Sequence, residues 1–456
     1  MSTTALAFVA AFFAFSVLAF IRHPIWGLFA YVLTFYMGPD TAWWGYVLPN
    51  LRWSMTSALI TLVAVLVYKA PVKRTPWYKF RPIPTLIVFT VWLWIQTPWA
   101  LSTSNHIFLA TLFTKYILMF ALIYACLDSK ERVHQFVIAH IIGCFWWGIE
   151  AWQIHTGGRL ESIGTGDVTG SAFASMHVST ALALAGFMFL GFRGWKRWVP
   201  FIAIPFILNS IILMQTRAAF VGMLAAAPIA FLLGPPAKRS VVMVYLLLGA
   251  GLLLTVADQA FWERMGTIKV AEPEQLETSA ASRFEIGKAN LAMARDYPLG
   301  LGHRGNDLLS PRYLDERWLT ATGGGSNIRS AHNTTLAVLV DHSMIGLLLI
   351  VLFHKRLAQS ILQIRRRAWN ARNQQAMALA AGLATGLVMY WINGQFANMT
   401  KAEVVIWIAA ITASIASEAT APESAKTNAQ IRGRYENKQP AKQSAPEAEE
   451  DSRNLH

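Results

Sequence analysis

A few charged or proton-accepting side chains stand out because they border long apolar segments. His332 and Asn333 in SAHNTTLAVLV precede one such segment, Arg217 separates two of them in IILMQTRAAFVGML, and Arg283 lies in the polar stretch ASRFEIGKANLAMARDYP. A neutral histidine can accept a proton from a hydroxyl at ordinary pH. A guanidinium presents a planar fork of donors that fits phosphate oxygens. These residue types suit a site that binds phosphate and deprotonates a hydroxyl.

Each of these residues also has a purely structural interpretation. Arg217 can extend to the external headgroups or pair with a carboxylate, although an arginine facing mid-membrane lipid costs about 3 kcal/mol. Arg283 can be a solvated arginine paired with Glu285. His332 can cap a helix or pack against tryptophans, and Asn333 can either orient the histidine or cap the helix. The residues by themselves leave both interpretations open.

The segments that position these residues have the length of membrane-spanning helices. Hydrophobic residues make up 55% of the 456 residues and charged residues 14%. The apolar runs approach the roughly 20 residues that a helix needs to cross a bilayer, and they lack the two-residue alternation of barrel strands. We predict an all-α, polytopic membrane protein with 12–13 transmembrane helices. The predicted spans are residues 5–20, 24–38, 55–68, 84–100, 107–127, 133–152, 173–192, 198–214, 217–234, 240–257, 332–353, 375–396 and 403–418.

Lysine and arginine gather in alternate loops between these spans. The basic clusters lie at 69–81, 193–197, 238–239 and 355–367. By the positive-inside rule those loops are cytoplasmic, and the net charge of +14 needs no nucleic-acid partner. Arg217, Arg283 and His332 then all lie on the external side. Two fixed cations and one proton acceptor on one face suit a diphosphate held beside an attacking hydroxyl, with neither a metal nor a general acid strictly required.

The spans divide the chain into four regions. Residues 1–257 form an N-terminal group of helices, and residues 258–331 form one large external loop. Apolar residues from Phe284 to Met293 recur at helical spacing, which predicts an amphipathic helix near the membrane surface. Residues 332–418 form the C-terminal helices, and the composition of 419–456 predicts a disordered cytoplasmic tail.

The segment GLGHRG at 300–305 matches the dinucleotide-binding pattern G-x-G-x-x-G by letters only. A dinucleotide site needs a preceding buried strand and a following helix in a βαβ unit, and this segment follows Pro298 in a membrane-protein loop. Its glycines instead predict a close turn.

Four segments in this order resemble the O-antigen ligase and polymerase superfamily. HNTTLAVLVDHSMIGLLL is similar to its His-Asn helix start, and QTRAAFVGML to its Ser/Thr-Arg-small segment, with Thr216 where many members have serine. The stretch from Arg283 to Asn306, with DYPLGLGHRGN, is similar to its Arg, Pro-Leu-Gly-x-Gly run. HPIWGLFAYVLTFYMGPDTAWWGYVLP further resembles the O-glycosylation ligases associated with exosortase systems.

The resemblance implies a multi-pass glycosyltransferase of the GT-C type in the bacterial inner membrane, with a periplasmic active site. It implies transfer of O-antigen glycan from undecaprenyl diphosphate to a lipid A-core hydroxyl, with inversion and without metal or cofactor. Arg217 and Arg283 match the diphosphate-binding arginines, and His332 matches the histidine proposed as base. Arg304 and Arg159 are candidates for lining the path of the glycan or the core sugars, and Asn333 and His303 are further supporting candidates.

Other functions use the same motifs. A polymerase would extend the glycan on its lipid carrier, and a protein O-glycosylation ligase would use a protein acceptor with the same donor. A transporter of lipid-linked sugars would bind its anionic cargo with the same arginines, although the sequence shows no internal repeat of the kind common in transporters. All of these interpretations share a lipid-linked glycan and membrane lipids as partners.

Overall fold

The computed structural model describes residues 2–68, 75–164, 170–256, 262, 273–319 and 327–419. Within these ranges the chain forms helices and no strand, which confirms the predicted all-α class. Seven of the described helices are long and apolar enough to cross a membrane, and further apolar helices are shorter.

The N-terminal helices are α1 Thr3–Ile21, α2 Ile25–Met37, α3 Trp53–Val67, α4 Ile83–Gln96, α5 Thr103–Cys126, α6 Lys130–Ile154, α7 Ser171–Gly191, α8 Trp195–Met214, α9 Arg217–Leu233 and α10 Arg239–Val256. The later helices are α12 Pro273–Asp296, α13 Gly305–Leu309, α14 Glu316–Leu319, α15 Thr334–Asn370, α16 Gln374–Asn393 and α17 Val404–Ala419.

Every predicted span coincides with one of these helices, and α15 differs most from its prediction. It continues to Asn370 instead of ending near 353, so the basic cluster at 355–367 lies on a helix and not in a loop. The sequence from 354 to 369 contains no glycine or proline, and its Leu, Gln, Arg and Lys residues favour a helix. Hydropathy predicts only the part of a helix that lies in the membrane, whereas helix propensity can extend the helix beyond it.

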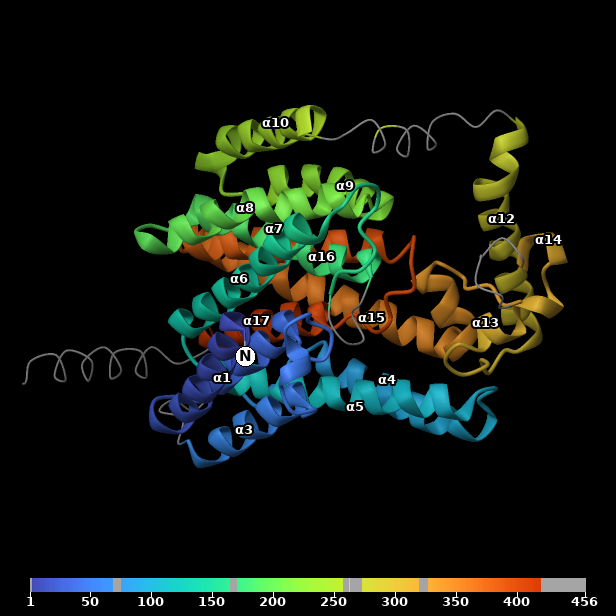
Figure 1. Ribbon diagram of the computed structural model, residues 1–456, viewed down its shortest axis with the longest axis horizontal. Coiled ribbons are helices and arrows are strands. Elements are labelled where there is room, and N and C mark those ends of the chain that lie inside the picture. The colour runs from blue at the N-terminus through green and yellow to red at the C-terminus, as the bar shows by residue number, and fades with distance from the viewer. Residues whose placement is uncertain are drawn as a thin grey trace, which may run out of the picture.

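Small residues allow the helices to approach one another closely. α16 packs along α7 and α9, near the middle of the bundle in Figure 1. A Cβ atom added at Gly382 of α16 would lie 3.3 Å from the Cα of Leu184 in α7, so the two backbones are nearly in contact. Such packing is typical of helix pairs in lipid, where apolar side chains gain little from leaving the solvent.

The basic residues of several segments meet at one end of the bundle. Arg365 of α15 donates from Nε to the carbonyl of Leu233, 2.7 Å away, and Arg356 donates to Oγ1 of Thr85 over 2.6 Å. The segment with α12, α13 and α14 caps the opposite end, on the right in Figure 1. The basic residues gathered at the first of these ends are the ones on which the predicted orientation rests.

α12 packs on α15 and runs crosswise to the long helices of the bundle (Figure 1). Ile286 and Met293 of α12 are buried in a cluster that includes Val340 of α15. Phe284 and Leu291 do not join that cluster and are 67% and 56% exposed. The predicted amphipathic helix therefore has one apolar side packed on protein and another exposed, as expected for a helix at a membrane surface.

The segment with α12, α13 and α14 is held by a break in α15. Ser343 has φ 69° and ψ 175°, so the helix is interrupted there and the carbonyls before it lose their intrahelical donors. The amide of Leu301 donates to the carbonyl of Val340 over 3.0 Å, and Nε1 of Trp92 donates to that of His342 over 2.8 Å. These bonds join the loop and α4 to the interrupted helix.

The predicted close turn is present and requires glycine. Gly300 and Gly302 have φ values of 80° and 79°, in the left-handed region. A Cβ atom at Gly300 would lie 2.7 Å from the carbonyl oxygen of Asp341, and one at Gly302 would lie 2.5 Å from the Cβ of Ala100. The backbone approaches α15 and the start of α5 too closely for any side chain.

The two ends of the bundle can be assigned to the two sides of the membrane by cysteine labelling. Cys126 and Cys144 are fully buried, so the unchanged chain provides an unlabelled background. Arg312→Cys at the end with α13 should react with a membrane-impermeant maleimide on spheroplasts. Asn370→Cys at the basic end should react only after the membrane is opened. Both positions are exposed. Labelling of Asn370→Cys on sealed spheroplasts would show that the orientation is inverted.

Candidate functional site

His332 immediately precedes α15 and is exposed. Its φ of 46° lies in the left-handed region, which costs a non-glycine residue about 1–2 kcal/mol. Asn333 caps the helix, because its Oδ1 accepts from the amide of Leu336 over 3.0 Å. Its Nδ2 donates to the carbonyl of Gln395 over 3.2 Å. The structure thus shows Asn333 as a cap that fixes the backbone on which His332 stands.

The connection between α16 and α17 surrounds the same helix start. The amide of Thr334 donates to the carbonyl of Gly394 over 2.7 Å, and its Oγ1 donates to the carbonyl of Ala397 over 2.8 Å. The amide of Met399 donates to that same hydroxyl over 2.8 Å. Residues 394–399, which connect α16 to α17, are therefore held by hydrogen bonds beside His332.

Two guanidinium groups lie close to His332. Cζ of Arg283 is 5.8 Å from the ring centroid of Phe396, which lies in the connection between α16 and α17. Partial desolvation, followed by the positive charges of Arg329 and Arg283, lowers the pKa of His332, while Asp307 acts in the opposite direction. The imidazole is consequently neutral at pH 7 and can accept a proton.

Arg329 is a site residue that the sequence analysis missed. Its backbone amide donates to Oγ of Ser310 over 2.7 Å. Desolvation and the charge of Arg283 both lower its pKa, and its Nε is buried with no hydrogen-bond partner among the described residues. Two neighbouring cations, one with an unpaired buried donor, favour a bound anion. The available signal was proximity, since Arg329 stands in IRSAHN, three residues before the histidine.

Arg283 does not form the ion pair expected from the structural interpretation. Its neighbour Glu285 pairs with Lys288 at 2.7 Å, and Arg283 makes no ion pair with any residue that the structure describes. The guanidinium is exposed and remains available to a ligand.

Arg217 is the first residue of α9, and that end of α9 lies at the site's end of the bundle. A Cβ atom at Gly222 of α9 would lie 3.6 Å from Nδ2 of Asn393, the last residue of α16. The residue after it, Gly394, accepts a hydrogen bond from the amide of Thr334 at the start of α15. The tertiary contacts of α9 and α16 therefore put Arg217 on the side of His332. Its part in the cluster of Arg283 and Arg329 is a proposal.

Two of the supporting candidates are engaged in local ion pairs. Arg159 pairs with Glu161 at 2.5 Å and donates from Nε to the carbonyl of Met214 over 3.3 Å, so it supports the turn that precedes α9. Arg304 pairs through Nε with Asp307 at 3.2 Å. Both arginines hold segments that flank the site.

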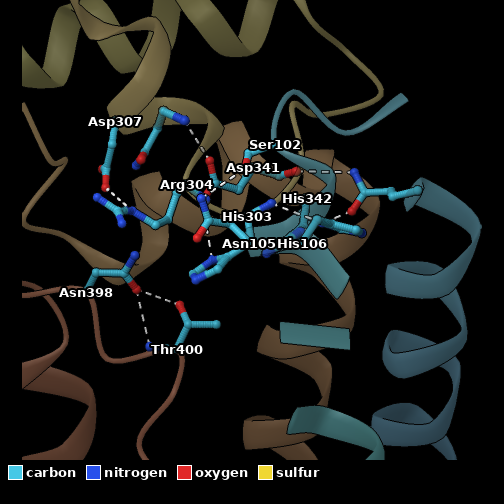
Figure 2. A network of polar contacts seen from close by, with 12 residues as sticks. Ser102, Asn105, His106, His303, Arg304, Asp307, Asp341, His342, Asn398 and Thr400 are labelled. Carbon is cyan, nitrogen blue, oxygen red and sulfur yellow. Dashed lines mark hydrogen bonds and ion pairs between the residues drawn. The ribbon is translucent and has the colours of Figure 1, made fainter. Parts of the chain in front are cut away.

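His303 points into the protein, toward Asp341 and His342, as Figure 2 shows. Its backbone amide donates to Nδ1 of His106 over 3.0 Å. Burial, followed by the charge of Lys401, lowers the pKa of His303 to about 3, so the ring is neutral. His303 belongs to this buried network and not to the exposed surface at His332.

An apolar groove begins at the start of α15 and follows that helix. Thr334, Thr335 and Gln395 line one end, and Phe353 and His354 line the other. About 20 residues of helix span about 30 Å, which is the thickness of the hydrocarbon core. The lining is mostly apolar, and Thr334 and Thr335 at its polar end lie next to His332 along the chain.

The chain was compared with known proteins. Residues 202–351 match the family model described as O-antigen ligase. No curated protein matches the chain. The matched segment contains Arg217, Arg283, Arg329 and His332. Residues 202–351 of this membrane protein are therefore similar to the O-antigen ligase family.

Proposed function

We propose that this chain transfers O-antigen glycan from undecaprenyl diphosphate to a lipid A-core hydroxyl at the periplasmic face of the inner membrane. The observation that carries the proposal is the proximity of His332 to Arg283 and Arg329 beside one end of the apolar groove. The family match supports an enzyme of the ligase or polymerase type. The basic residues at the opposite end of the bundle support the orientation.

Each part of the donor has a matching part of the site. The undecaprenyl chain occupies the groove along α15, and its diphosphate lies between Arg283 and Arg329, with Arg217 completing the cationic surface. The first sugar then projects toward the exposed imidazole of His332. A diphosphate and several guanidiniums are complementary in charge and in hydrogen-bond geometry.

In the reaction, the acceptor hydroxyl oxygen attacks the anomeric carbon of the first sugar. Its proton passes to the neutral imidazole of His332, and the bond between the anomeric carbon and the diphosphate oxygen breaks. Undecaprenyl diphosphate leaves with the bonding electron pair, and the arginines stabilise its charge. A direct displacement of this kind inverts the configuration at the anomeric carbon.

Covalent transfer in a reconstituted system tests the proposal. The purified chain is placed in liposomes with undecaprenyl-diphosphate glycan and lipid A-core, and the mobility of the acceptor is read on a gel. A shifted acceptor supports a ligase. Lengthened glycan on the carrier without acceptor would instead identify a polymerase, and transfer to an added protein acceptor alone would identify a protein ligase. Donor moved across the bilayer without a new bond would identify a transporter.

Replacement of His332 tests the base. His332→Ala should lower the transfer rate by about 10²-fold or more, because general-base catalysis commonly contributes that much. His155→Ala is a suitable control, since His155 bonds only the nearby carbonyl of Gly158 in the described structure. Both variants should elute from gel filtration like the unchanged chain. Full transfer by His332→Ala would refute the assignment.

Replacement of the arginines tests the diphosphate site. Arg283→Ala and Arg217→Ala should each raise the donor concentration needed for half-maximal rate about tenfold or more, since a hydrogen bond to a charged group contributes about 1.5–3 kcal/mol. Arg312→Ala is the control, because Arg312 is exposed and lies outside the cluster. An unchanged donor requirement would exclude the replaced arginine from the donor site.

The pH dependence tests the coupling of Arg329 to His332. Because the pKa of His332 is lowered, kcat/KM for the donor should persist below pH 6.5, the ordinary histidine value, and fall only as the imidazole becomes protonated. Arg329→Gln removes the larger of the two positive influences on the pKa of His332, so the acidic limb should move to higher pH, whatever happens to the maximal rate. Arg312→Gln should leave the limb in place. A limb that stays fixed in Arg329→Gln would contradict the coupling.

A further inference from the structure

A second cluster of functional groups lies inside the protein, apart from the exposed surface at His332. His303 comes from the external loop, and Asp341 and His342 come from α15 just before its break (Figure 2). All three are buried, and one potential ligand atom from each lies within 4.8 Å of the others. The proposed transfer reaction assigns no role to this cluster.

The hydrogen bonds of Gln96 determine which nitrogen of His342 carries the proton. Nε2 of Gln96 donates to the carbonyls of Leu299 and Asp341, over 2.8 and 3.2 Å. Its Oε1 can only accept, so Nδ1 of His342, 3.0 Å away, must be the donor. In the neutral ring, Nε2 of His342 therefore has a free lone pair. Proteins orient metal-binding histidines through hydrogen bonds of this kind to the ring nitrogen that does not bind the metal.

His303 has a buried nitrogen without a partner. Its Nδ1 forms no hydrogen bond with any residue that the structure describes, and its side chain is 6% exposed. The nearest carboxylate oxygen, Oδ2 of Asp341, is 4.0 Å away, which is too long for a hydrogen bond. Leaving such a nitrogen unpaired costs about 1–3 kcal/mol. The geometry calls for a further atom between the two groups.

Among the described residues, Asp341 also has no positively charged partner at hydrogen-bond distance. Its Oδ1 accepts from the amide of Asn306 over 2.8 Å, and its Oδ2 from the amide of Arg304 over 3.0 Å. Both donors are neutral, and the Arg304 side chain pairs with Asp307 instead. A buried carboxylate is costly unless a cation compensates its charge.

We propose that His303, Asp341 and His342 bind one divalent transition-metal ion of the zinc class. Two imidazole nitrogens and a carboxylate oxygen are a ligand set that zinc accepts, whereas magnesium and calcium prefer oxygen ligands. Ligand atoms around tetrahedral zinc are about 3.3 Å apart, so atoms that now lie within 4.8 Å of one another must approach by up to about 1.5 Å when the ion binds.

His106 supports the site without being a ligand. Its Nδ1 accepts from the amide of His303 over 3.0 Å, and its Nε2 donates to the carbonyl of Leu93 over 2.6 Å. Both ring nitrogens are therefore engaged. The ion joins the external loop to α15 at Asp341, which lies nine residues, or about 13 Å of helix, after His332. It therefore acts as a structural clamp between these two segments. The clamp is independent of the proposed transfer reaction.

Metal content measures the site directly. The full chain, purified in detergent without chelator, is incubated with zinc, desalted and analysed by inductively coupled plasma mass spectrometry. We expect about one zinc per chain in the unchanged protein and a loss to background in His303→Gln and His342→Gln. His354→Gln is the matched control, since His354 is another buried histidine of α15 that lies far from the cluster. It should retain the metal.

A chelation experiment on the unchanged chain keeps the proposal testable if the variants fail to fold. EDTA should lower the Tm in detergent, and zinc should restore it where magnesium does not. The proposal is overturned if the unchanged chain binds no zinc, if His303→Gln and His342→Gln keep as much zinc as His354→Gln, or if removal of the metal leaves the Tm unchanged.

Discussion

The structure depends on how the broken backbone of α15 is satisfied. A carbonyl exposed within or at the edge of a membrane must find a donor inside the protein, because lipid offers none. The amides of Leu301 and Gly302 and the indole of Trp92 supply these donors to residues 340–342. Since residues 301 and 302 directly precede His303 and Arg304, the same bonds position the loop that follows α12. The break is thus what ties the external segment, with Arg283, to the helix that starts beside His332.

Electrostatics explain why the cluster at the helix start suits an anion. Arg283 and Arg329 lie close enough to lower the pKa of His332, and Arg283 lowers that of Arg329. In the absence of a ligand, like charges in a partly desolvated place destabilise one another. In the proposed function, a bound diphosphate compensates the positive charges of Arg283 and Arg329 and removes that cost. Donor binding and proton transfer would then use the same group of side chains.

The groove along α15 relates the charged cluster at His332 to the apolar part of the helix bundle. Its apolar lining extends from Thr334 to His354, and the charged cluster of Arg283 and Arg329 lies at the end with His332. A lipid carrier placed there would bring its head to the level of α12 and its tail to the level of the bundle core. Asn333 and the 394–399 connection hold this boundary rigidly, because each is bonded to the first turn of α15.

The sequence by itself determined the helical class, the positions of the spans and the common side of Arg217, Arg283 and His332. These are local properties: hydropathy, helix propensity and loop charge can be read within about 20 residues. The break at Ser343, the cluster with Arg329 and the buried group of His303, Asp341 and His342 were decided only by the tertiary structure. Gln96 orients His342 across 246 positions, and the loop of Gly300 and Gly302 reaches Asp341 from a distant segment. Contacts between residues so far apart in the sequence arise from tertiary packing and produce no periodic pattern in the sequence.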